Sequence, residues 1–171
     1  MKTFAATALL ALLPTVASAA WEEIEGGATT RPIETNSTIQ AIMVSCVDGP
    51  VVEVYSDKDG PVLPVADPSA TADYFYKAGA VEASVDDKTF PLATAGSDIA
   101  IVLFSEGPEA ESHLAPLDPK FLSALRTGST LRLSFDVTPA AGPDGSVYDT
   151  WARFSLEGAG PMIEKIVKSC S

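Results

Sequence analysis

The sequence predicts a mainly β fold: one antiparallel domain, β-sandwich-like or barrel-like, with two short α-helices. Three observations predict it. Apolar and polar residues alternate in several short runs, which is the period of a strand with one buried face. Turn residues closely separate neighbouring runs, so the strands are expected to pair as antiparallel hairpins. Only two segments switch to a helical spacing of their apolar residues.

The clearest local signal runs from residue 117 to residue 137. Asp118 precedes Pro119, and an Asp N-cap before Pro at the first helical position is a typical helix start. Gly128 is expected to end this helix, because glycine takes a left-handed conformation without steric cost. Apolar residues then alternate with polar ones over residues 131–137, which indicates a strand buried on one face.

Two pairs of runs predict further hairpins. Residues 38–47 and 51–55 form the first pair, on either side of an Asp-Gly-Pro turn. Residues 81–85 and 90–92 form the second pair. Residues 98–104 are almost continuously apolar, which predicts a short strand buried on both faces.

The remaining segments complete the expected order. Residues 21–25 are expected to form an edge strand or an anchoring arm, and residues 26–37, which are polar and rich in turn residues, a loop. Residues 105–116 are typical of an acidic loop, and residues 147–156 alternate as a strand does. Gly160 and the Pro that follows it begin a terminal helix with an apolar stripe.

Residues 1–20 have the pattern of a secretory signal peptide. Lys2 gives a basic start, residues 4–13 form a short apolar run, and residues 17–19 are a cleavage signal of small residues. The run is too short to span a membrane, and no later segment is long and apolar enough to do so. The expected mature protein is a single β-rich domain, residues 21–171, in the periplasm or the secreted space.

The chain is strongly acidic. It has 23 Asp and Glu residues against 11 Lys and Arg residues, which gives a formal net charge of -12. This charge repels nucleic acid and anionic lipid, so neither is an expected partner. It fits either a basic partner or a surface that is charged for solubility alone.

Cys46 and Cys170 are the only cysteines. An exported protein with an even number of cysteines most simply forms disulfides, and two cysteines allow one pairing. This bond would join an early strand to the end of the chain. A zinc or redox pair is the alternative, but the two cysteines are far apart, no CxxC is present and the chain has a single His.

The sequence predicts no catalytic residue, no metal site and no cofactor. It contains no GxSxG, HExxH, P-loop or dinucleotide-binding motif. His113 is the only His, and its acidic surroundings are typical of a solvated loop side chain. Paired Asp or Glu carboxylates could serve a hydrolase, but the sequence singles out no pair.

Tyr74 and Tyr76 are the best candidates for ligand contact. They flank Phe75, and three successive aromatic residues on a strand cannot all face the core. At least one of them is therefore expected at the surface. The alternative is that they pack beneath the Pro- and Asp-rich loop that precedes them.

Several segments together resemble known periplasmic proteins. They are an N-terminal Trp21, an apolar strand that ends at Cys46, a hairpin around VDDKTFPL, a helix of the type FLSALRTG, and the ending FSLEGAGPMIEKIVKSC. In this order the chain is similar to bacterial periplasmic proteins grouped with invasion-associated locus B, and it also looks like type VI secretion-associated periplasmic proteins. The resemblance implies a periplasmic, β-sandwich-like module with an envelope or host-interaction role, and it supplies no catalytic residue.

Two main functions fit these observations. The first is an exported, non-enzymatic binding module that recognises a protein partner in the envelope or the secreted space through a sheet edge or an aromatic-bearing loop. The second is a secreted hydrolase that uses carboxylates. A structural subunit of a secretion-associated envelope assembly is a further alternative.

Overall fold

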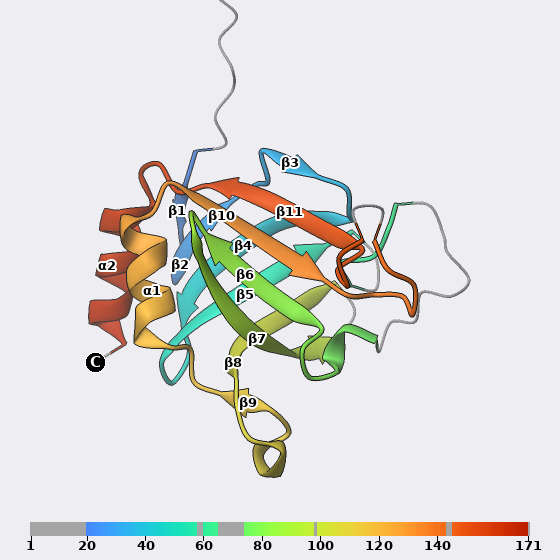
Figure 1. Ribbon diagram of the computed structural model, residues 1–171. Helices are drawn as coiled ribbons and strands as arrows, with labels where there is room; N and C mark the ends of the chain where they lie inside the picture. Colours follow the sequence, from blue (N-terminus) through green and yellow to red (C-terminus); the bar gives the residue numbers. More distant parts are fainter. Residues whose placement is uncertain (1–19, 58–59, 65–73, 98, 143–144, 171) are drawn as a thin grey trace, which may run out of the picture.

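The part of the chain that the structure describes forms one antiparallel sheet of eleven strands and two short α-helices (Figure 1). This confirms the predicted class, a mainly β, antiparallel single domain with two short helices. The computed structural model describes residues 20–57, 60–64, 74–97, 99–142 and 145–170, so all but the last residue of the expected signal peptide lies outside the described residues. The elements are β1 (Glu22–Ile24), β2 (Gly27–Thr30), β3 (Glu34–Thr35), β4 (Ile39–Cys46), β5 (Pro50–Ser56), η1 (Tyr74–Tyr76), β6 (Val81–Val85), β7 (Lys88–Ser97), β8 (Ala100–Glu106), η2 (Glu109–Glu111), β9 (Leu114–Ala115), α1 (Pro119–Thr127), β10 (Thr130–Phe135), β11 (Thr150–Ser155) and α2 (Ala159–Ser169).

The strands follow the order β1-β2-β4-β5-β8-β7-β6-β10-β11-β3, and β9 pairs with β8 outside this path. The sheet curls until its two ends approach each other. The indole Nε1 of Trp21, just before β1, donates a hydrogen bond of 2.9 Å to the carbonyl oxygen of Ser155 at the end of β11. The sheet does not close into a barrel, so β1 and β3 lie at the two ends of the strand order, and β9 is a further edge strand beside β8.

The curled sheet encloses one apolar core. Alternate residues of the central strands point inward, so that on β10 the side chains of Leu131, Leu133 and Phe135 are fully buried. The helices contribute to the same core, because Phe121 of α1 and Ile163 of α2 are also fully buried. Burial of this apolar surface is the main force that stabilises the fold.

Two strands depart from the predicted pattern of burial. The sequence predicts burial on both faces for residues 98–104. On β8, however, only Ile101 and Leu103 are buried, and the alternate residues Ala100, Val102 and Phe104 remain partly exposed. On β4 the register shifts between Ile39 and Ala41. This bulge changes which residues face inward, so Ile39 joins the core although strict alternation groups it with Ala41.

The first helix begins as predicted but ends for a different reason. The Asp118 side chain accepts a 2.7 Å hydrogen bond from the backbone N–H of Lys120, which caps the start of α1. Gly128 ends the helix with φ of -79°, so it is not left-handed as predicted. A Cβ at this position would collide with Cγ1 of Val85, so the close approach of β6 requires glycine.

The second helix packs beside the first and is tied to the sheet. In Figure 1 α1 and α2 lie side by side at one end of the curled sheet. A Cβ on Gly160 would lie 2.6 Å from the carbonyl oxygen of Arg126, so glycine permits this close helix contact. Just beyond α2, Cys170 reaches Cys46 at the end of β4, with Cα atoms 5.5 Å apart, and the two cysteines pair as the sequence predicts.

The opposite end of the sheet is covered by η1 and by the loop between β10 and β11 (Figure 1). The ring of Phe75 on η1 is buried and packs edge-on against Phe135, with ring centroids 6.4 Å apart. The hydroxyl of Thr150 at the start of β11 donates a 2.6 Å hydrogen bond to the carbonyl oxygen of Pro61. This end is therefore closed by a single 3-10 turn and loop segments, where the other end has two α-helices.

Two segments predicted as loops contain strands. Residues 26–37 include β2 and β3, and residues 105–116 include β9, which pairs with β8 to form a projecting hairpin (Figure 1). The pairing was concealed because β3 and β9 are edge strands of two residues each, and because β2, although mostly buried, consists of small and polar residues, GATT. No helix within the described residues is long and apolar enough to cross a membrane.

Candidate functional site

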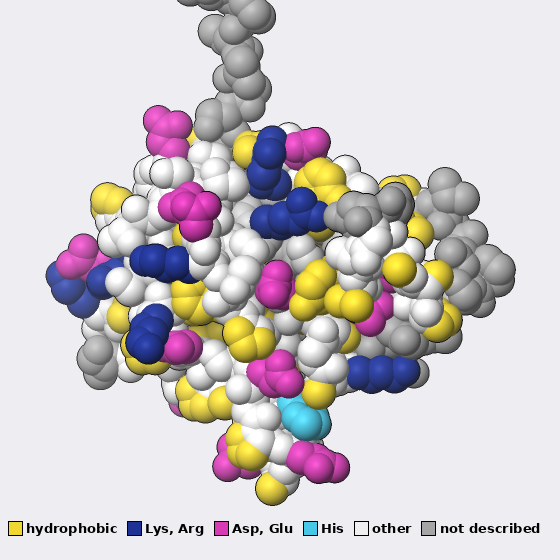
Figure 2. Space-filling model, viewed as in Figure 1, with side chains coloured by type: hydrophobic (Ala, Val, Ile, Leu, Met, Phe, Trp, Pro, Cys, Tyr) yellow, Lys and Arg dark blue, Asp and Glu magenta, His cyan; other side chains and the backbone are white. Residues whose placement is uncertain are grey.

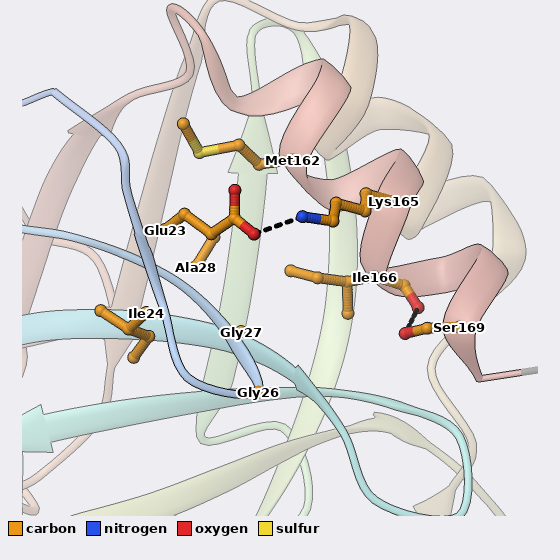
Figure 3. A pocket seen from close by; sticks show the side chains of 9 residues that line it. All are labelled: Glu23, Ile24, Gly26, Gly27, Ala28, Met162, Lys165, Ile166 and Ser169. Atoms are coloured by element: carbon orange, nitrogen blue, oxygen red, sulfur yellow. Dashed lines mark hydrogen bonds and ion pairs between the residues drawn. The ribbon is translucent and has the colours of Figure 1, made fainter.

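A cavity of about 180 Å³ lies between the β1–β2 hairpin and α2, and we call it the α2 cavity (Figure 3). One wall comes from the beginning of the described chain and the other from its end. The residues that line it are Glu23, Ile24, Gly26, Gly27, Ala28, Met162, Lys165, Ile166 and Ser169.

Two glycines shape the hairpin wall of the α2 cavity. Gly26 has φ of +79°, which a tight turn between β1 and β2 requires and which other residues adopt at a steric cost. A Cβ on Gly27 would lie 2.5 Å from the carbonyl oxygen of Val44, so glycine brings β2 close to β4. The β1–β2 hairpin is thereby packed closely against β4, which positions this wall of the cavity.

The floor of the cavity is apolar and its mouth is charged. Met162 and Ile166 are four residues apart on α2, so they share one face of the helix and point toward the hairpin (Figure 3). Lys165 forms an ion pair with Glu23 across the mouth. The two side chains are 70% and 59% exposed, and exposed ion pairs contribute only about 0–1 kcal/mol, so this pair can exchange for other charged groups.

The disulfide holds the two walls together. Cys170 directly follows Ser169, which lines the cavity, and Cys46 directly follows Ser45, which pairs with Gly27 of the hairpin wall. The end of α2 is therefore covalently attached to the strand that carries the opposite wall. The cavity is preformed, which lowers the entropic cost of filling it.

The structure places the predicted contact residues at the other end of the sheet. Tyr74 and Tyr76 lie on η1, opposite the helices in Figure 1, so neither lines the α2 cavity. The hydroxyl of Tyr76 donates a 2.8 Å hydrogen bond to the carbonyl oxygen of Gly96, and its ring contacts Phe75. The side chain of Tyr74 lies outside what the structure describes. A ligand-contact role for Tyr74 and Tyr76 stays a prediction.

A pair of carboxyl groups, Asp136 and Asp149, lies at this same end. Asp149 is only 6% exposed and accepts hydrogen bonds of 2.8–2.9 Å from the backbone N–H groups of Val137 and Thr138 and from the Thr138 hydroxyl. These donors occupy its carboxylate. Asp149 therefore fixes the start of the β10–β11 loop to the start of β11.

The second carboxyl of the pair, that of Asp136, has a raised pKa. Burial raises the pKa of Asp136, and the nearby charge of Asp149 raises it further, while Lys77 lowers it. Its Oδ1 atom is buried and accepts no hydrogen bond within the described residues. Burial also raises the pKa of the Tyr148 phenol nearby, and the charges of Glu82, Glu106 and Asp136 raise it further. We interpret Asp136 and Asp149 as structural residues that hold the backbone of the β10–β11 loop.

His113 lies on the projecting β8–β9 hairpin. Its backbone has φ of +62°, and its Nδ1 lies 3.3 Å from the carbonyl oxygen of Gly107. Among the described residues, no three His, Cys, Asp or Glu side chains gather as a metal site would require.

Sequence reasoning missed the α2 cavity. The helix stripe of Met162 and Ile166 is visible in the sequence, but a stripe of this kind is normally explained by core packing. The opposite wall, at Ile24 and Ala28, is far away in the chain. Only the curl of the sheet and the disulfide bring these segments together.

Comparison with known proteins finds no family model that matches the chain, no curated protein that matches it and no matching solved structure. The resemblance to invasion-associated locus B proteins and to type VI secretion-associated periplasmic proteins therefore stays an expectation.

Proposed function

We propose that the protein is an exported, non-enzymatic binding module whose α2 cavity receives one large apolar side chain of a protein partner. The observation that carries this proposal is the cavity itself: it is preformed, apolar at its floor and charged at its mouth. Apolar anchors that enter a pocket of this kind supply most of the binding energy in many interfaces. Export is part of the proposal, and the leader-like residues 1–20 and the cysteine pair support it.

The size of the cavity favours a single side chain. An apolar cavity of about 150 Å³ accepts a benzene molecule, and the α2 cavity measures about 180 Å³. Sites for drug-sized ligands and cofactors are larger, roughly 300–1,000 Å³. A Phe, Leu or Met side chain of a partner therefore fits better than a free cofactor.

The position of the cavity favours a partner that binds in an extended conformation. β1 is an edge strand, and its Ile24 is 39% exposed beside the cavity. An edge strand offers backbone N–H and carbonyl groups to an incoming strand, while pockets beside it select the side chains. Glu23 and Lys165 add charged groups that pair with opposite charges on the partner.

The test fills the cavity and compares the outcome with a matched change outside it. Met162→Trp places a large side chain in the cavity, whereas Glu164→Trp places the same side chain on the exposed face of α2. Partners are captured from the native envelope or secreted fraction by residues 21–171 and identified by mass spectrometry. We expect a partner that is retained by the wild type and by Glu164→Trp and lost by Met162→Trp.

Two results would contradict the proposal. One is equal recovery of the partner by Met162→Trp and Glu164→Trp, which would show that the cavity is not used. The other is an empty capture by wild-type protein that melts cooperatively. The melting temperatures of the two Trp variants are measured before the recoveries are compared. A loss of partner caused by unfolding is then distinguished from a loss caused by filling the cavity.

A further inference from the structure

A second hollow, of about 270 Å³, lies on the outer face of the sheet between the β4–β5 turn and β9, and we call it the β5–β9 groove. It does not share a lining residue with the α2 cavity. The residues that line it are Val47, Asp48, Gly49, Pro50, Val51, Leu103, Phe104, Leu114, Ala115, Pro116 and Leu117.

The groove exists because two short strands share one edge of β8. β5 pairs with β8 as far as Leu103, through Val52, and β9 pairs with β8 from Ser105 onward, through Ala115. Phe104 lies between these two pairings. The gap between the end of β5 and β9 therefore leaves the outer side of Phe104 partly uncovered.

Apolar side chains form the floor and one rim of the groove. Val51 and Phe104 lie on the outer face, because the residues beside them, Val52 and Leu103, point into the core. Val47, in the turn at the rim, is 67% exposed. A contiguous exposed apolar surface with polar surroundings often marks an interaction site.

Three carboxylates lie in or near the groove. Asp48 lines the groove directly. Glu53 is two residues beyond Val51 on β5, and Glu106 is two residues beyond Phe104 on β8, so both point to the same outer face. No Lys or Arg is among the residues that line the groove.

The projecting hairpin next to the groove extends the acidic surface. Glu109 and Glu111 are exposed on η2, between Glu106 and β9. Figure 2 shows acidic side chains gathered on this projection around the single His, whose side chain is drawn in cyan. The net charge of the whole chain, -12, has the same sign and attracts cationic partners at longer range.

We propose that the β5–β9 groove binds an extended segment of a protein partner in which one large apolar residue is flanked by Lys or Arg. The apolar residue lies against Phe104 and Val51, and the flanking cations pair with Glu53 and Glu106. The proposal stands on charge complementarity and is independent of the α2 cavity.

The test measures the binding of a labelled peptide, Gly-Lys-Lys-Phe-Lys-Lys-Gly, to residues 21–171 by fluorescence anisotropy. A second peptide replaces Phe with Gly and keeps every charge. We expect the second peptide to bind at least tenfold more weakly, because it lacks the group that covers the apolar floor. We also expect the affinity for the first peptide to fall as salt is added, since exposed charges are screened.

A matched pair of variants separates the groove from general attraction by the acidic surface. Glu53→Gln with Glu106→Gln removes two carboxylates beside the groove, and Glu22→Gln with Glu25→Gln removes two exposed carboxylates from the β1–β2 hairpin. The first double variant should bind the peptide at least tenfold more weakly than the wild type. The second should bind within about twofold of the wild type.

Two outcomes would overturn this inference: equal binding of the Phe and Gly peptides, or equal weakening by the two double variants. Either would show attraction to net charge alone. Met162→Trp changes only the α2 cavity and should leave peptide binding unchanged. The two proposals are therefore tested by different variants, and either can fail without the other. Weakening of peptide binding by Met162→Trp would show that the peptide binds elsewhere.

Discussion

The two ends of the curled sheet are closed by different chemistry (Figure 1). At the helix end, α1 and α2 cover the core with apolar side chains, and the disulfide joins residues that are 124 positions apart. The loop end is closed by non-covalent contacts: Phe75 packs against Phe135, and the hydroxyl of Thr150 donates to Pro61. The carboxylate of Asp149 there holds backbone groups only 11 and 12 positions away. The covalent long-range closure is expected to determine whether the whole domain is stable, whereas the local contacts of Asp149 determine how one loop is held.

The difference matters for the two proposed binding surfaces. The α2 cavity belongs to the helix end, so its shape depends on the same contacts as global stability. The β5–β9 groove lies on the outer face; Val47 on its rim directly follows Cys46 of the disulfide, and no residue of the loop end lines it. Changes at the loop end should therefore alter stability without altering either surface.

The largest expected effect is at the helix end. Cys46→Ser or Cys170→Ser removes the constraint on a very long loop, and the chain-entropy model gives a loss of about 4–5 kcal/mol in the free energy of unfolding. Urea unfolding followed by circular dichroism measures the loss. The single variants and the double variant should behave alike, because each removes the same bond. A midpoint equal to that of the oxidised wild type would show that the bond does not contribute.

A smaller effect is expected at the loop end. Asp149→Ala leaves two buried backbone N–H groups and one hydroxyl without their acceptor, and a hydrogen bond to a charged group contributes about 1.5–3 kcal/mol. We expect a loss of about 2–4 kcal/mol in the free energy of unfolding. Asp149→Asn is the control, because its remaining carbonyl oxygen can still accept and should recover part of the loss. If Ala and Asn cost the same, the carboxylate acceptor is not what holds the loop.

The smallest expected effect is the pH dependence of stability, in which one carboxyl group at each end acts with the opposite sign. The raised pKa of Asp136 means that the folded protein binds this proton more tightly than the unfolded chain. The contribution of Asp136 to stability is therefore largest below its ordinary pKa of 3.8 and is lost as pH rises through the raised value. Asp136→Asn should gain stability relative to the wild type as pH increases toward neutrality.

Glu164 on α2 provides the contrast for this pH series. Its hydrogen bond and charge interaction with Lys168 lower its pKa, so its contribution is present above the ordinary pKa of 4.5 and is lost as pH falls. Glu164→Gln should therefore lose stability slightly relative to the wild type as pH increases. Melting temperatures between pH 3 and 7 would measure both variants. Parallel pH curves for the two variants would contradict the assignment of opposite shifts.

Much of the fold could be predicted because its signals are local. The Asp118 cap, the hairpins at residues 38–55 and 81–92, and the alternation on β10 are all encoded by neighbouring residues. The bulge between Ile39 and Ala41 could not be predicted, because it depends on the register with β5. The strands within residues 26–37 were also missed, since their partners lie on β4 and β11.

The candidate sites were harder to predict for the same reason. Tyr74 and Tyr76 attracted interest as an aromatic cluster, but the chain forms a 3-10 turn there and places Phe75 between them in the core. The α2 cavity combines Ala28 with Ile166, and no local pattern connects two such distant positions. The gap beside Phe104 depends on where two strands stop pairing, which is a property of the whole sheet.

The disulfide also sets the path of mechanical force through the molecule. If tension is applied between Trp21 and Cys170, it passes along residues 21–46 and then crosses directly through the covalent bond. This covalent path bypasses β5 to β11 and both helices, which are connected to it only by non-covalent contacts such as the hydrogen bond from Trp21 to Ser155. The β1–β2 hairpin, a short edge pairing, would yield first under traction, and with it one wall of the α2 cavity would be pulled open.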